Sequence, residues 1–327
     1  MVPIVIRTPS LLLFLTLLLA GCQKPMVFEP VPDWAYPTNP PPPPGPPPTL
    51  TPGPFQIANS KVSFTRAEVT NLFAAPDWRP EDHPPMPPVV ANGRKPDVRA
   101  CAYCHLPTGN GRPENARLAG LPVGYFVAQM NAFRDGSRKS HVTGRAPTIN
   151  MSNTAKAIQD DEILAAARYF AALPAASFTR VVEQSTIPKA KIAAWLFRFD
   201  RTGPQEPLGQ RIVEGPDDFE QFEIRDPATT YTAYVPEGSI ALGKRLAETW
   251  GENKTLECSS CHGPGYGGKD DVPNIAGRSP TSIVRQLYDF RSSARRGAKS
   301  TEMDKVVKYM SNSDMLALAA YLASLTP

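Results

Sequence analysis

The sequence predicts an all-α fold in which a small β-containing connector joins two similar helical domains. The first observation is a Cys-x-x-Cys-His motif that occurs twice, at residues 101–105 and 258–262. The second is that each motif lies in a block, roughly 89–174 and 236–326, whose segments follow in the same order. A repeat of this kind indicates that one structural plan is used twice.

The two blocks match at several spacings. The first cysteine precedes an Ala-Gly pair by 18 residues in both copies, and "QMNAFR" in the first block parallels "QLYDFR" in the second. Near the ends, "DDEILAAARYFAAL" at 160–173 parallels "NSDMLALAAYLASL" at 312–325. Apolar residues three and four positions apart predict helices in both. Their starts have capping-box spacing, Gln159 to Glu162 and Ser311 to Asp314.

Composition is that of a globular protein with one unusual stretch. Hydrophobic residues make up 41% and charged residues 20% of the 327 residues, and the net charge is only +4. This balance gives no electrostatic reason to expect a nucleic-acid partner. Many of the 38 prolines lie in 22–54. Proline this dense favours extended polyproline II, so we predict that 22–54 is a semi-rigid tether.

The N-terminus resembles a bacterial lipoprotein signal. Arg7 precedes the apolar run "LLLFLTLLLA" at 11–20, which is too short to span a bilayer comfortably. The following "LAGC" resembles a lipobox, so residues 1–21 are predicted to be the signal peptide and Cys22 the lipidated first residue of the mature chain. An ordinary signal peptide with a chance cysteine is the alternative. Gln23, rather than aspartate, weakly favours the outer membrane without deciding between the two membranes.

The remaining segments flank the blocks. Residues 55–88 form an N-terminal extension with one short helix expected at 65–75. The connector at 175–235 contains "AWLFRF", in which Trp195, Phe197 and Phe199 alternate, and the β-prone "TTYTAYV". The first domain is therefore assigned to 89–174 and the second to 236–327.

The repeated motif is the attachment sequence for haem c. Its two thiols add to the haem vinyl groups and its histidine ligates iron, which assigns these roles to Cys101, Cys104, His105, Cys258, Cys261 and His262. A zinc corner would have to gather four ligands from both motifs, and only two other histidines exist. A thioredoxin-like dithiol would need a βαβ context. Two covalently bound haem c groups are therefore expected.

The repeat also selects the sixth iron ligand. Met151 and Met303 each lie 18 residues before a tyrosine of the last helix. Met130, Met310 and Met315 align with leucine or isoleucine in the other block and are expected in the core, and His141 has no counterpart. We therefore predict His/Met ligation, which favours Fe(II) and leaves no open iron position.

Each haem histidine is expected to donate its other ring nitrogen to a backbone carbonyl, which fixes the tautomer. The candidate segments surround Pro107 and Pro273, although the counterpart of Pro273 in the first block is Ala116. Basic side chains near the motifs could steer an acidic redox partner or could form solvated faces, and the acidic run at 214–223 is expected to be solvated.

These motifs, with "RLAG" and "NIAG" and the paired final helices, resemble the class I cytochromes c, and among them the diheme cytochromes of the c-four type. The resemblance covers a little over half of the chain. It implies two all-α class I haem domains that face each other and pass electrons between respiratory partners.

Three departures accompany the resemblance. The first block lacks the longer helix "GSIALGKRLAETWG" of the second, where Gly243 would be a helix-contact glycine equivalent to Gly93. The first haem would then be more exposed, or covered by residues 55–88. The connector is longer than the family's linker, which leaves the face-to-face arrangement open, and the tether adds membrane attachment.

The sequence thus predicts an electron-transfer protein rather than an enzyme, lipid-anchored in the bacterial periplasm. Its expected partners are redox proteins, a dehydrogenase as donor and a terminal oxidase or another protein as acceptor. A peroxidase-like diheme enzyme with one open haem is the alternative, and it would require His141 to displace Met151. A haem-based sensor would lack an output domain.

Overall fold

The computed structural model describes residues 1, 29–41, 52–249, 256–297 and 300–327. Residues 2–21 of the predicted signal peptide, and Cys22, lie outside the described residues. Within the described ranges, no helix is long and apolar enough to cross a membrane.

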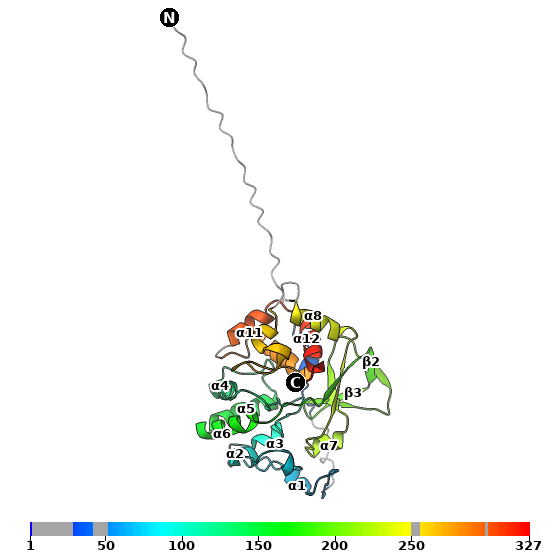
Figure 1. Ribbon diagram of the computed structural model, residues 1–327. Coiled ribbons are helices and arrows are strands. Elements are labelled where there is room, and N and C mark those ends of the chain that lie inside the picture. Colours follow the sequence, from blue (N-terminus) through cyan, green and yellow to red (C-terminus); the bar gives the residue numbers. More distant parts are fainter. Residues whose placement is uncertain (2–28, 42–51, 250–255, 298–299) are drawn as a thin grey trace.

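Two sets of helices follow the repeat (Figure 1). The helices of the first block are α2 (Pro88–Ala91), α3 (Cys101–His105), α4 (Val123–Arg134), α5 (Ala146–Ala157) and α6 (Asp160–Ala171). Those of the second are α8 (Ser239–Glu248), α9 (Ser259–His262), the 3-10 turn η4 (Pro264–Tyr266), α10 (Pro280–Arg291), α11 (Ser300–Val307) and α12 (Asn312–Ser324). The predicted mainly α architecture is confirmed.

The two helix sets correspond closely. The helices α4 and α10 each contain 12 residues. Both final helices begin with a capping box, in which Glu162 accepts from the backbone N–H of Gln159 (2.8 Å) and Asp314 from that of Ser311 (2.9 Å). Each set encloses its own apolar core, with Phe170 fully buried in the first and Met315 in the second.

Gly243 lets α8 and α12 approach closely. A Cβ atom at this position would overlap the backbone carbonyl of Ala317 and crowd Tyr321. The expected helix-contact role is therefore confirmed for Gly243. It is wrong for Gly93, which has φ +64° and turns the chain against the backbone of Val98 to Ala100.

Gly243→Ala is expected to destabilise the protein by about 1–3 kcal/mol, because the added methyl forces two packed helices apart. Chemical denaturation of the holoprotein measures the free energy of unfolding. Gly144→Ala is the matched control, since nothing lies within 4 Å of a Cβ built there. Equal effects of the two substitutions would contradict the close helix contact.

The connector forms the predicted β-structure. Its elements are β1 (Thr179–Glu183), β2 (Thr186–Pro188), β3 (Ala190–Ala193), β4 (Leu196–Phe199), β5 (Gln205–Pro207), β6 (Val213–Pro216), α7 (Phe219–Glu223) and β7 (Tyr231–Val235). In the main sheet, β7 pairs in parallel with β1 and antiparallel with β6. The strands β3 and β4 form a hairpin whose turn contains Trp195, with φ +68°. The sequence pattern predicts Trp195 in the strand with Phe197 and Phe199, but Trp195 lies in the turn before β4.

Glu214 on β6 fixes the connector to the second domain. Its carboxylate is fully buried and accepts hydrogen bonds from Ser279 Oγ (2.7 Å) and from the backbone and hydroxyl of Thr281, at the start of α10. The helix N-terminus offers unpaired N–H groups that favour such an acceptor. The expectation that the whole acidic run is solvated is therefore wrong at Glu214.

Burial raises the pKa of Glu214 more than its hydrogen bonds lower it. A raised folded-state pKa gives stability below the unfolded value, near 4.5, that is lost as pH rises through the folded value. Relative to Glu214→Gln, which cannot titrate, the wild type should therefore lose free energy of unfolding between about pH 4 and neutral pH. Denaturation at a series of pH values measures this, and a parallel pH profile of the two proteins would contradict it.

The N-terminal segments correct the tether prediction. Residues 29–41 include the 3-10 turn η1 (Asp33–Ala35) and pack on the second domain, where Ala35 and Tyr36 join the core. Glu29 accepts from the backbone N–H of Asn312 (2.7 Å). An apolar Trp-Ala-Tyr stretch among the prolines explains why this part docks rather than standing free.

The extension 55–88 contains α1 (Arg66–Val69) and the 3-10 turn η2 (Pro80–Asp82), so the helix expected at 65–75 is only four residues long. It packs on the connector through Trp78, whose Nε1 donates to the carbonyl of Ile224 (2.9 Å). The backbone carbonyl of Leu72 accepts from Ala100, which directly precedes the first motif. The extension thus lies over the first domain, as one of the two sequence alternatives proposed.

Candidate haem-binding sites

Each Cys-x-x-Cys-His motif forms a single helical turn, α3 in the first domain and α9 in the second. The four cysteines carry free thiols in this structure rather than disulfides. Burial raises the pKa of Cys101 to about 12 and that of Cys258 to about 11. A redox dithiol or a thiolate metal ligand has the opposite requirement, a lowered thiol pKa. The raised pKa values of Cys101 and Cys258 therefore argue against a redox dithiol and against a thiolate metal site.

The two motif histidines are each held in one neutral tautomer. His105 Nδ1 lies 2.7 Å from the carbonyl oxygen of Ala116, and His262 Nδ1 lies 2.8 Å from that of Pro273. A carbonyl can only accept, so Nδ1 is the protonated nitrogen and Nε2 keeps its lone pair. The expected carbonyl bonds are confirmed at equivalent positions. The carbonyl of Pro107 instead accepts from Tyr169 (2.6 Å).

Burial also keeps these imidazoles neutral. It lowers the pKa of His105 to about 4, opposed by the carbonyl hydrogen bond and assisted by Arg138. The pKa of His262 is lowered as well, again chiefly by burial. A neutral imidazole is the form that coordinates iron.

The methionines fall into a buried group and a half-buried group, as the repeat predicted. Met130, Met310 and Met315 are buried in the two cores, which confirms their packing role. Met151 on α5 and Met303 on α11 are half-buried at the margins of the same cores. Their role as iron ligands stays a prediction.

The two other histidines already have structural contacts. His141 is exposed, its ring lies 6.1 Å from that of Tyr36 between centroids, and its backbone N–H donates to Asp289 (2.8 Å). His83 contacts Asp77 through Nε2 (3.1 Å) and the carbonyl of Pro84 through Nδ1 (2.9 Å). His141 therefore faces the N-terminal segment, which gives no support to its displacing Met151.

The two domains meet through a reciprocal interface. Arg138 and Arg295 each follow the first cysteine of their motif by 37 residues. Arg138 donates to Gln286 of the other domain (3.1 Å), and Arg295 donates to Gln129 (2.9 Å). The backbone joins the same segments, because Lys139 N–H donates to the carbonyl of Ala294 (2.8 Å). The face-to-face arrangement that the long connector left open is therefore present.

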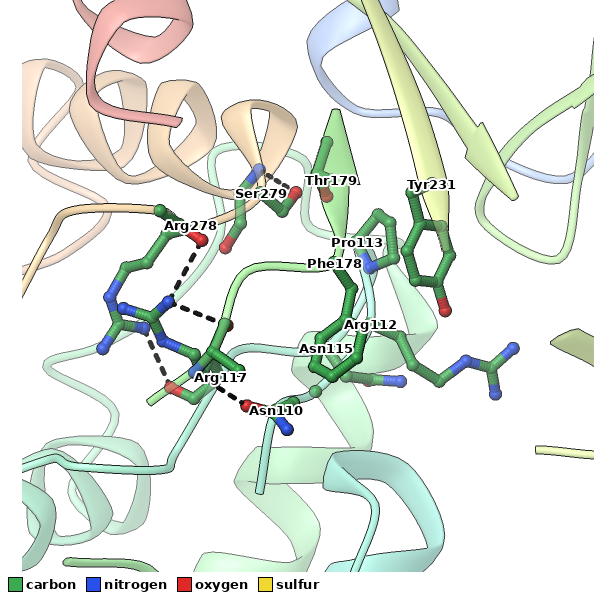
Figure 2. A pocket seen from close by; sticks show the side chains of 14 residues that line it. Asn110, Arg112, Pro113, Asn115, Arg117, Phe178, Thr179, Tyr231, Arg278 and Ser279 are labelled. Atoms are coloured by element: carbon green, nitrogen blue, oxygen red, sulfur yellow. Dashed lines mark hydrogen bonds between the residues drawn. The ribbon is translucent and has the colours of Figure 1, made fainter. Parts of the chain in front are cut away.

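Arg117 extends this interface and borders a small cavity (Figure 2). It donates to the carbonyls of Gly277 (3.0 Å) and Ala276 (2.8 Å) and to the amide oxygen of Asn274 (2.8 Å). Asn274, its positional equivalent, donates back to the carbonyl of Gly120 (3.1 Å). The cavity is about 30 Å³, room for water but not for an organic substrate.

Buried arginines provide the test of whether these residues fit a haem. Burial, and then Arg295, lower the pKa of Arg138 to about 9. Burial likewise lowers the pKa of Arg145 to about 9, and its Nε and Nη2 have no hydrogen-bond partner among the described residues. Uncompensated buried cations are costly and call for anions. The propionates of haem c would supply them, so Arg138, Arg145 and Arg295 are the side chains suited to hold those carboxylates.

These burials revise the interpretation of the basic residues. Arg285 and Arg295 are at most 7% exposed, and Arg138 is half-buried against the second domain, so none of the three forms an open docking or solvated face. Arg134 instead binds the carbonyls of Ala155 and Ile158, at the end of α5. The predictions from the sequence did not include the binding of Arg138 and Arg295 across the domain interface. Their equal spacing from the two motifs is the signal that could have indicated it.

The fold and the two sites define a class of protein, one that holds covalently attached haem c for electron transfer. The family model described as Cytochrome c matches residues 240–326. A cytochrome c-554(548) from Halomonas halodenitrificans is 32% identical over 75 residues, which are 23% of this chain and 90% of that protein. The chain belongs to the cytochrome c family and is a diheme cytochrome of the c4 type.

Two longer relatives cover both domains. A thiosulfate dehydrogenase electron acceptor from Stutzerimonas stutzeri is 26% identical over 235 residues, 71% of this chain and 82% of that protein. A cytochrome c4 from Pseudomonas aeruginosa is 23% identical over 230 residues, 69% of this chain and 83% of that protein. These similarities mark the protein as an electron carrier rather than an enzyme.

Proposed function

We propose that this diheme cytochrome is a periplasmic, lipid-anchored carrier that accepts electrons from a dehydrogenase of reduced inorganic sulfur compounds. The similarity to thiosulfate dehydrogenase electron acceptors from two bacteria, over about 70% of the chain, supports the donor class. A terminal oxidase, or a carrier leading to one, is the proposed acceptor. The observation that carries the proposal is the pair of neutral, carbonyl-bonded histidines on either side of the reciprocal interface.

In this proposal the motif residues bind the haems, and the carbonyls of Ala116 and Pro273 orient the histidine rings. Each motif carries one haem c, which supplies the Fe(III)/Fe(II) couple. His105 and His262 ligate iron through Nε2, with Ala116 and Pro273 holding their rings, and Met151 and Met303 are the proposed sixth ligands. Filled iron positions restrict the protein to outer-sphere electron transfer.

The first experiment is an optical spectrum of the reduced protein with and without carbon monoxide, together with a haem count. Two haems and no spectral change support the carrier. A change in the absorbance of one haem would instead support a peroxidase-like enzyme. Reduction of the cytochrome by a purified thiosulfate dehydrogenase with thiosulfate tests the donor, with enzyme-free and thiosulfate-free mixtures as controls. No reduction above those controls would contradict the donor class.

Cys22→Ser is expected to move the protein from the membrane fraction to the soluble periplasmic fraction, because stable anchoring depends on the lipid chains attached to that cysteine. Immunoblots of fractionated cells measure the shift. Gln23→Ser, beside it, should leave the protein in the membrane fraction. Retention of Cys22→Ser at the membrane would show that the cysteine is not the anchor.

A further inference from the structure

The chain covers its own first haem-attachment turn. The guanidinium of Arg225, which follows α7 in the connector, lies 3.6 Å from the ring centroid of Tyr103 and donates to the Tyr103 carbonyl (2.7 Å). Tyr103 is one of the two residues between the motif cysteines and is 7% exposed. In Figure 1, α7 and α1 lie close to α3. Burial raises the pKa of the Cys104 thiol, and the positive charge of Arg225 partly opposes this rise.

A second contact closes the same surface. Arg112 lies 3.6 Å from the ring centroid of Phe222 on α7 and pairs with Glu114 (3.0 Å). Both charged residues are nearly buried, at 8% and 9% exposure. Burying an ion pair costs free energy of desolvation. We therefore interpret the packing of α7 on Arg112 as a specific structural contact.

The equivalent surface of the second domain is open. Counted from the first cysteine of each motif, Tyr103 corresponds to Ser260, Arg112 to Lys269 and Glu114 to Asp271. All three residues of the second domain are exposed, and so is Cys261, whereas its equivalent Cys104 is half-buried. The connector and the extension have no counterpart there among the described residues.

We propose that redox partners dock on the open surface around Cys261, and that the first haem exchanges electrons with them through the second. Thioether bonds hold the haem edge at the motif cysteines, and electron transfer rates fall steeply with distance. The edge at Cys104 is separated from a partner by α7 and the extension, while the edge at Cys261 is not. This inference rests on the proposed attachment of one haem at each motif.

The open surface indicates the chemistry of the partner. Its centre is uncharged, with exposed Ser260, Pro264 and Gly265, and Leu256 is 37% exposed beside it. Among the described residues, Glu257, Lys269 and the two aspartates that follow Lys269 place charges at the rim. The partner is therefore a redox protein with a small, mainly uncharged contact surface, and its association rate should depend weakly on salt.

The first test measures access to each haem in the oxidised holoprotein. The paramagnetic NMR signals of haem methyl groups are recorded with and without a neutral, soluble gadolinium chelate. We expect the methyl signals nearest the thioethers of one haem to broaden at least fivefold more than those of the other. Arg225→Ala should bring the protected set toward the exposed one. Arg201→Ala, another connector arginine over an aromatic ring, should not.

The second test blocks each surface without disturbing the fold. Lys269→Cys, capped with a bulky maleimide polymer, should slow oxidation of the reduced protein by a small single-haem cytochrome c at least tenfold. Lys61→Cys, exposed on the extension and capped alike, should change the rate less than twofold. Equal broadening of both haems, or equal slowing by both caps, overturns the proposal. A count of one haem would instead defeat the proposed function.

Discussion

Met303→Ala is expected to open the second haem to exogenous ligands. Removing the proposed thioether ligand would leave His262 as the one protein ligand of the haem iron, so carbon monoxide should change the reduced spectrum of one haem and leave the other unchanged. The potential of the opened haem should fall by on the order of 0.1–0.2 V, within the range of about 0.8 V that axial ligands span. Met151→Ala should produce the same change in the first haem.

Met310→Ala is the matched control, because Met310 lies seven residues further along and is 3% exposed in the second core. It should cost about 2–5 kcal/mol of stability through the cavity it creates, with no carbon monoxide binding. Potentiometric titration and carbon monoxide difference spectra measure both properties. Spectra of Met303→Ala that match the wild type would remove the ligand assignment.

Arg117→Ala should uncouple the two domains. The substitution leaves the carbonyls of Ala276 and Gly277 without their donor in a buried interface, at about 1–3 kcal/mol for each unsatisfied group. From these two groups we expect a loss of about 2–6 kcal/mol in the free energy of unfolding. We expect the wild type to unfold in one transition and the variant in two, because each domain has its own core.

Lys305→Ala provides the comparison for a charged residue that is not buried. Lys305 pairs with Glu302 on the surface (3.0 Å), with both side chains more than 60% exposed. Such pairs contribute little, so its removal should cost less than about 1 kcal/mol and leave one transition. If Arg117→Ala behaved like Lys305→Ala, the interface would not couple the domains.

Local patterns in the sequence predicted the parts of the fold that local physics decides. The motif fixes its cysteines and histidine within one helical turn, and the apolar spacing of 312–325 produces α12. The acceptor of His262 lies at Pro273 as predicted, whereas the acceptor of His105 is Ala116 rather than a residue around Pro107. In each case the determining residues lie within about 18 positions of one another.

The parts that sequence could not predict depend on contacts across the chain. Arg138 looks like any surface arginine until the second domain covers it. Glu214 looks solvated until α10 presents its N-terminus, 65 positions away. Trp34 and Tyr36 lie in a proline-rich stretch, and only their contacts with the second domain and the connector show where they pack. Burial of this kind is a property of the assembled surfaces.

If Cys22 is lipidated as proposed, the docked segment at 29–41 limits how far the protein can stand from the membrane. Six residues lie between Cys22 and Glu29, and the seven steps of chain span at most about 25 Å. A lipid on Cys22 would therefore keep the second domain within a few nanometres of the bilayer. The search for a partner in the same membrane then takes place in a thin layer, where the local concentration is far above the average for the compartment.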